Sequence, residues 1–195
     1  DDVFSEEHLL VRDAARQWVK RNVSPIIEEY AQKAEFPKQI ISGLAEIGAF
    51  GPSLPVKYGG GGMDEIAYGV IMQELERCDS GLRSMASVQG SLVMYPIYKY
   101  ATEEQKMKCL PGLISGDHVG ALAMSEAGAG SDVVSMKLRA EKRNDHYRLS
   151  GNKYWITNGP DADTLVVYAK TDLDAGAKGI TAFLIEKEMT GFSTS

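Results

Sequence analysis

Cysteine is scarce in this sequence, and its scarcity excludes a fold built on disulfide bonds. Only Cys78 and Cys109 occur among 195 residues, each in a helix-like stretch with charged neighbours. Two isolated thiols make no framework for an oxidising compartment, so we expect a reducing one. The histidines, His8, His118 and His146, are scattered singly with no cysteine or carboxylate at ligand spacing. A metal site is therefore not expected.

Long apolar runs and an excess of basic charge are also missing. No run approaches the roughly 18 apolar residues that span a bilayer, so no membrane span is expected. The first residues, DDVFSEEH, are acidic where a targeting peptide would be basic. We therefore expect a soluble chain or one whose targeting peptide has been removed. The net charge of -6, from 27 acidic and 21 basic residues, argues against nucleic acid as a partner.

Two kinds of periodicity divide the chain. From Ser5 to about Ser115 apolar residues recur with helical spacing, whereas after Gly116 they alternate with a period of two. The length suffices for one large or two small domains with a real core. The sequence thus predicts an α+β protein, with a helical bundle in residues 1–117 and an antiparallel β-domain in residues 118–195.

Several helix boundaries are marked by their residues. Ser5 is a plausible N-cap for a first amphipathic helix, and Pro37 opens a second helix that Gly48 ends. Thr102 and Gln105 form a capping box for the last helix. Pro96 predicts a kink or break in the stretch before it.

The strands are marked by alternation and by turn residues. A hairpin is expected around the turn Asn144-Asp145. Two further strands are expected at Thr164–Lys170 and Gly179–Ile185, separated by a polar loop.

The segment Ala121–Asp132, ALAMSEAGAGSD, carries the most chemical information. Its glycines and small side chains let backbone N–H groups approach a ligand, and Ser125 and Ser131 add hydroxyl donors. It is neither a dinucleotide fingerprint nor a phosphate-binding loop with Gly-Lys-Ser. Taken alone, it is compatible with an ordinary tight loop.

The segment Lys153–Gly159, KYWITNG, is the second candidate. The indole of Trp155 beside the hydroxyl of Thr157 could cover a flat heteroaromatic ring and hydrogen-bond its edge. The alternative is a tryptophan that belongs to the core of a sheet.

Together and in this order, the two segments resemble the flavin-binding elements of the acyl-CoA dehydrogenase family. AMSEAGAGSDVVS, residues 123–135, fits the family signature at every restricted position, and Trp155-Ile-Thr157 resembles its second flavin contact. Ala127 replaces the usual proline after the motif glutamate. Residues before about Ser115 look like the glutaryl-CoA dehydrogenase branch, and the later residues look like the isovaleryl-CoA dehydrogenase branch. A recombined or designed chain and an unusual natural paralogue would each explain this.

The resemblance implies a set of site residues. FAD would contact residues of both motifs, namely Leu122, Met124, Ser125, Gly130, Ser131, Trp155, Ile156 and Thr157. Ser131 would also touch the CoA moiety. Arg83 and Ser84 would meet a distal carboxylate of the acyl group, whereas a residue at a helix start is otherwise simply solvated. Glu126 is expected to be a structural member of its loop.

The resemblance also implies α,β-dehydrogenation of a short acyl-CoA, with electrons passed to an electron-transfer flavoprotein. The family places its catalytic base in a C-terminal helical domain, so we assign no catalytic residue here and expect a partial, inactive enzyme. The complete enzyme would be a homo-oligomer, a homotetramer in this family, of the mitochondrial matrix or bacterial cytoplasm. The alternatives are a flavin oxidase or monooxygenase of the same fold, and a non-catalytic designed or truncated module.

Overall fold

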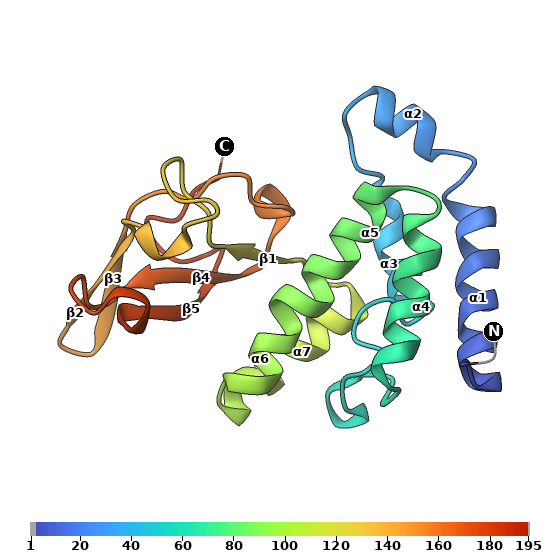
Figure 1. The fold of residues 1–195 in the computed structure, drawn as a ribbon, viewed down its shortest axis with the longest axis horizontal. Coiled ribbons are helices and arrows are strands. Elements are labelled where there is room, and N and C mark those ends of the chain that lie inside the picture. The colour runs from blue at the N-terminus through green and yellow to red at the C-terminus, as the bar shows by residue number, and fades with distance from the viewer. Residues whose placement is uncertain (1–2, 195) are drawn as a thin grey trace. The chain divides into compact units, whose positions relative to one another are not determined.

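The computed structural model describes residues 3–194, and chain contacts divide it into two units, up to His118 and from Val119 onward. The first unit is helical and the second is built on a β-sheet (Figure 1). Each unit is described by itself below.

The helical unit contains seven α-helices among the described residues. They are α1 (Glu6–Asn22), α2 (Ile27–Gln32), α3 (Ile41–Glu46), α4 (Glu65–Glu76), α5 (Ser80–Ser87), α6 (Tyr95–Tyr100) and α7 (Glu103–Ser115). Ser5 caps α1 as predicted, and Thr102 and Gln105 form the predicted capping box of α7. The predicted second helix is a short 3-10 turn (Lys38–Ile40) followed by α3.

Helices α1 and α4 lie side by side, and their contact includes a buried charge (Figure 1). Arg16 of α1 donates two hydrogen bonds, of 2.9 and 2.8 Å, to the carboxylate of Glu74 in α4. The Glu74 side chain is only 3% exposed, and its bond from Arg16 lowers the pKa of the carboxyl despite burial. The cation therefore makes a buried carboxylate tolerable between the two helices.

The predicted break near Pro96 is a widened helical segment. Residues Val88–Met94 form a π-helix between α5 and α6, with the N–H of Tyr95 bonded to the carbonyl of Gly90. Pro96 is the second residue of α6, directly after this wider segment, so the N–H that proline lacks falls where π-type bonding changes to α-type bonding. The chain therefore stays helical through this stretch instead of breaking.

Gln89, within the π-helix, is completely buried. Its side-chain amide donates hydrogen bonds of 2.8 Å to the carbonyls of Leu113 and His118. Gln89 thus fixes the end of α7 and the chain that leaves it.

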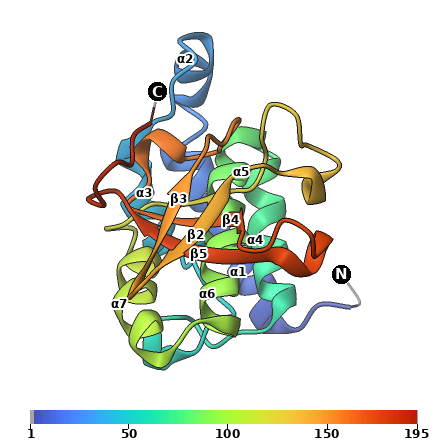
Figure 2. The same cartoon turned by 90° about the vertical axis from the view of Figure 1, so that its left-hand side faces the viewer.

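The second unit is a five-stranded sheet whose strands are β1 (Gly120–Ala123), β2 (Arg139–Arg143), β3 (His146–Ser150), β4 (Thr164–Lys170) and β5 (Ile180–Glu186). The predicted hairpin is β2 and β3, which Figure 2 shows beside β4 and β5. β4 has its predicted bounds, and β5 lies one residue later than predicted.

The α+β class is confirmed, but the sheet is mixed and not antiparallel throughout. β4 pairs with β5 in antiparallel orientation, whereas β1 pairs with β4 in parallel, from Gly120 with Thr164 to Ala123 with Val167. β2 also meets β4 in parallel, at Arg139 and Lys170. The parallel pairs arise because the β2–β3 hairpin lies between β1 and β4 in the sequence, so β4 returns in the direction of β1.

The core of this unit lies on one face of the sheet. Its buried members are Ala121, Ala123, Leu138, Ala140, Ala162, Leu165, Val167 and Ala169. Because side chains alternate along a strand, Leu122 of β1 points to the opposite face and is half-buried.

Candidate functional site

The two motif segments lie together in the second unit. The backbone N–H of Tyr154 donates a 3.0 Å hydrogen bond to the carbonyl of Ser125. The neighbouring Lys153 ammonium donates to the carbonyl of Met124 at 2.8 Å. Two consecutive residues of one segment thus hold two consecutive carbonyls of the other.

Glu126 is buried within the first segment and accepts hydrogen bonds from three donors. Its carboxylate accepts the backbone N–H groups of Lys137 at 2.6 Å and Leu138 at 2.9 Å, and the Lys153 ammonium at 2.9 Å. Burial raises the pKa of Glu126, but these hydrogen bonds together outweigh it and lower the pKa below its ordinary value. A carboxylate held in this way is a structural member of the loop and a poor proton acceptor.

Trp155 has an unusual backbone and an open side chain. Its φ is +56°, in the left-handed region that a bulky residue rarely adopts, and the residue is 77% exposed. Among the ring pairs of the described residues, the indole is paired only with its neighbour Tyr154, with centroids 5.8 Å apart and the rings tilted by 50°. Backbone strain at an exposed aromatic residue is typical of a ligand site.

The other predicted flavin residues differ in how deeply they are buried. Leu122, Met124, Ser125 and Ile156 are half-buried, whereas Gly130, Ser131 and Thr157 are exposed. The loop between them is closed by two hydrogen bonds between Glu126 and Ala129, of 3.0 and 3.1 Å. Ser131 and Thr157 thus carry their hydroxyls on exposed residues, Ser131 in the loop after β1 and Thr157 in the turn between β3 and β4.

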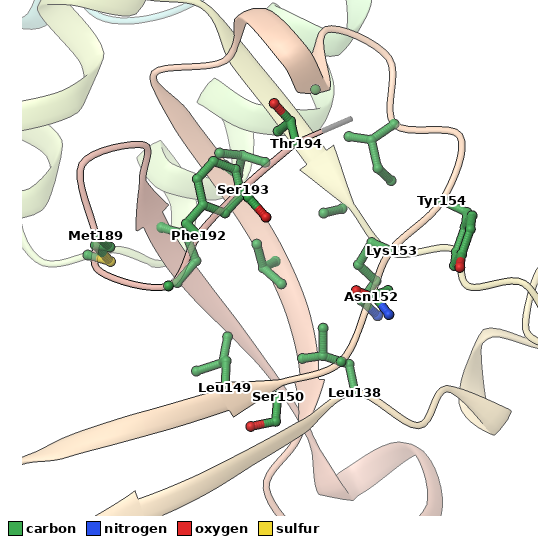
Figure 3. Close-up of a pocket in the computed structure, with 18 of the residues that line it drawn as sticks. Leu138, Leu149, Ser150, Asn152, Lys153, Tyr154, Met189, Phe192, Ser193 and Thr194 are labelled. Carbon is green, nitrogen blue, oxygen red and sulfur yellow. The ribbon is translucent and has the colours of Figure 1, made fainter.

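A cavity of about 1080 Å³ opens on the core face of the sheet. Figure 3 shows Asn152, Lys153 and Tyr154 along one side of it and Met189 and Phe192 along the other. Of the predicted flavin residues only Trp155 and Ile156 line it. This cavity and the predicted flavin contacts therefore coincide only at Trp155 and Ile156. Leu122 points to the opposite face of the sheet.

Arg83 and Ser84 lie in α5 of the helical unit. Arg83 Nε donates to Glu76 Oε2 at 2.5 Å, and Nη1 lies 3.4 Å from Ser87 Oγ. The Ser80 hydroxyl and Arg83 lower the pKa of Glu76. The Arg83 side chain is 37% exposed and ion-paired, so a ligand carboxylate would have to share it with Glu76.

Two residues of the second motif gained no role from sequence reasoning. Lys153 forms the buried ion pair with Glu126, and the Asn158 amide donates to the carbonyl of Gly120 at 3.1 Å. The one sequence feature that points to them is their position on either side of Trp155 within the segment Lys153–Gly159.

Within residues 3–194, no three His, Cys, Asp or Glu side chains are grouped so that they could hold a metal ion. No helix in that range is long and apolar enough to cross a bilayer.

The sequence matches the description "Acyl-CoA dehydrogenase, N-terminal domain" over residues 5–117 and "Acyl-CoA dehydrogenase, middle domain" over residues 121–195. The chain therefore belongs to the acyl-CoA dehydrogenase family, which confirms the resemblance seen in its motifs.

Individual relatives come from both branches that the sequence suggested. A mitochondrial isovaleryl-CoA dehydrogenase of Pongo abelii is 45% identical over 98% of this chain and 46% of its own length. A glutaryl-CoA dehydrogenase structure from Mycobacterium smegmatis is 40% identical with a TM-score of 0.92, covering 98% of this chain and 48% of that one. Another from this organism, in complex with FADH2, is 36% identical with a TM-score of 0.93, covering 99% of this chain and 48% of that one. The chain thus spans about half the length of the relatives it matches.

Proposed function

We propose that residues 1–117 and 118–195 are the N-terminal and middle domains of an FAD-dependent acyl-CoA dehydrogenase that acts on a short acyl-CoA, of the glutaryl or isovaleryl type. The observation that carries this proposal is the joining of the two motif segments through Tyr154 and Ser125. It brings together, within one unit, the two segments that resemble the family's flavin-binding elements.

The residues present fit a flavin. Trp155 offers a flat, exposed ring, and Gly130 leaves room for close approach because a Cβ added there meets no atom within 4 Å. We assign the flavin contacts to Leu122, Met124, Ser125, Gly130, Ser131, Trp155, Ile156 and Thr157. When bound, FAD would supply the acceptor for the hydride from the substrate β-carbon.

The chain's own residues would bind and orient. The Trp155 indole would cover one side of the flavin ring and exclude water from it, and the Ser125, Ser131 and Thr157 hydroxyls would donate or accept at its polar edge. Ser131 would also touch the CoA moiety.

The general base is proposed to come from outside these residues. Glu126 already accepts two backbone N–H groups and an ammonium, so it has little tendency to take an α-proton. A bound substrate would therefore be positioned by this chain and deprotonated by another part of the enzyme.

For the acyl group we propose contacts with Arg83 and Ser84. A guanidinium pairs with a carboxylate through charge-assisted hydrogen bonds, which would favour a dicarboxylyl thioester such as glutaryl-CoA. An isovaleryl group has no such charge and would make no use of Arg83.

In the whole enzyme, electrons would pass to an electron-transfer flavoprotein, and the assembly would be a homo-oligomer such as a homotetramer. The relatives come from mitochondria and from bacteria, which supports either the mitochondrial matrix or the bacterial cytoplasm.

The proposal is tested by titrating the purified chain with FAD and following flavin fluorescence. We expect binding in the micromolar range or weaker, further weakened in Trp155→Ala, and no dye reduction with glutaryl-CoA or isovaleryl-CoA. No FAD binding at any concentration would contradict the flavin assignment. Turnover that disappears in Glu126→Gln would contradict the assignment of the base.

A further inference from the structure

The ammonium group of Lys153 joins the two motif segments through side-chain atoms. The side chain is only 6% exposed, and Nζ donates to Met124 O at 2.8 Å and to Glu126 Oε1 at 2.9 Å. The Met136 sulfur lies 3.7 Å from Nζ. A buried ammonium is tolerated only where acceptors surround it, so its contacts fix its position.

Glu126 extends this connection to the chain entering β2. Its two oxygens accept the N–H groups of Lys137 and Leu138, just before that strand. One buried ion pair therefore links the residue after β1, the motif loop, the approach to β2 and the segment that carries Trp155.

The bond to Met124 is not required for neutralising Glu126. It instead orients the peptide group of Met124, whose neighbour Ser125 accepts the N–H of Tyr154. The side chain of Lys153 and the backbone of Tyr154 thus act on successive carbonyls. These two hydrogen bonds hold Tyr154, the residue before Trp155, against the end of β1.

We propose that Lys153 is a positioning residue, which fixes Met124 and Trp155 relative to each other so that both can contact the flavin. The proposal rests on the proposed function, since it concerns residues assigned to FAD. Lys153 acts through the Met124 carbonyl and through its own place next to Tyr154 in the chain.

Three variants separate positioning from simple stabilisation. Lys153→Met keeps the length of the side chain but removes the cation, Glu126→Gln removes the anion, and the double variant removes both. We expect Lys153→Met to weaken FAD binding about tenfold or more, because small misplacements of binding groups are costly. It should also lower the urea midpoint, because Glu126 loses its buried partner.

The double variant is the decisive one. Its urea midpoint should recover toward that of the unmodified chain, because no uncompensated charge remains. Its FAD affinity should stay as low as in Lys153→Met, because the Met124 carbonyl still lacks its donor. Recovery of affinity together with stability, or normal FAD binding by Lys153→Met, would overturn the proposal.

Lys187→Met is the matched control. Lys187 is a lysine of the same unit that is ion-paired with Asp163, but its side chain is 52% exposed. Its loss should leave the FAD dissociation constant within about twofold of the unmodified value, as for other exposed pairs. A loss equal to that of Lys153→Met would overturn the proposal.

Hydrogen exchange gives a readout that does not depend on flavin. The amide of Tyr154 should exchange faster in Lys153→Met and remain protected in Lys187→Met. Unchanged protection of Tyr154 would overturn the positioning role. If the unmodified chain binds no FAD, the proposed function fails, and this exchange still decides whether Lys153 orders the two segments.

Discussion

The side-chain amide of Asn158 donates a 3.1 Å hydrogen bond to the carbonyl of Gly120, the first residue of β1. Lys153 binds Met124, which directly follows the last residue of the same strand. The segment with Trp155 is therefore anchored at both ends of β1, and the tryptophan lies between the anchors. Because the segment is held on both sides of Trp155, the unfavourable φ of this residue can persist.

Two substitutions of Trp155 should separate the effect of its backbone strain on stability from the effect of its indole ring on FAD binding. Trp155→Gly should be more stable to unfolding than Trp155→Ala by about 1 kcal/mol, because only glycine adopts positive φ without penalty. Both variants should lose FAD affinity equally, since both lack the indole. Urea unfolding and FAD titration measure the two effects.

Ala34 provides the control for that comparison. It also has a positive φ, of 54°, but it lies in the helical unit outside the proposed site. Ala34→Gly should gain stability in the same way and leave FAD binding unchanged. Equal stability of the glycine and alanine variants at position 155 would mean that the strained conformation does not persist in solution.

Glu126 should make stability depend on pH in the acid range. Its folded-state pKa is lowered, so the carboxylate stabilises the fold above the unfolded pKa of about 4.3, and this contribution is lost as pH falls through the folded value. Glu126→Gln should cost about 1–3 kcal/mol at neutral pH, because a buried N–H loses its acceptor.

The measurement is the urea midpoint of both proteins from neutral pH down to pH 3. The gap between them should narrow as the pH falls, because protonation of Glu126 removes the charge that Glu126→Gln lacks. A gap that stays constant with pH would show that the charge of Glu126 contributes nothing.

Gln89 should be important for the stability of the helical unit. Gln89→Leu would leave the buried carbonyl of Leu113 and the partly buried carbonyl of His118 without the donor from Gln89, at a cost of about 2–4 kcal/mol. Ser91→Ala is a milder control, because Ser91 is exposed and its hydroxyl donates to the carbonyl of Ser87 in the same helical stretch. Faster hydrogen exchange at the end of α7 in Gln89→Leu, but not in Ser91→Ala, would locate the effect.

Arg83 tests the choice of substrate in a full-length enzyme that carries these residues. Arg83→Met should cost on the order of 2–4 kcal/mol in the specificity constant for glutaryl-CoA, because a charge-assisted contact is lost. Isovaleryl-CoA should lose far less. Equal and small changes with both substrates would mean that Arg83 serves only its ion pair with Glu76 and would favour the branched-chain substrate.

The sequence predicted the elements that carry strong local signals. The apolar and polar residues of 164–170 and the capping box at Thr102 are local features, and both were located correctly. The strand Gly120–Ala123 was missed because four small or apolar residues show no alternation, and its partner β4 lies far along the chain. The helix Ile27–Gln32 was missed because it buries no residue and so has no apolar stripe.

The candidate site shows the same limit. The motifs identified the segments around Ser125 and Trp155, but the role of Lys153 depends on side chains that meet across 27 residues of sequence. The positive φ of Trp155 also has no sequence signal, since tryptophan is not a residue that favours it.

The parallel pairing of β1 with β4 has a consequence for how this unit folds. β1 leaves the ribosome before the hairpin, the segment with Trp155 and β4, so it must wait for its partner. Non-local pairing of this kind is slow because loop closure precedes any gain in contacts. The contacts of Met124 and Ser125 with Lys153 and Tyr154 also join residues far apart in the chain, so the proposed flavin surface forms only after the intervening hairpin has been made.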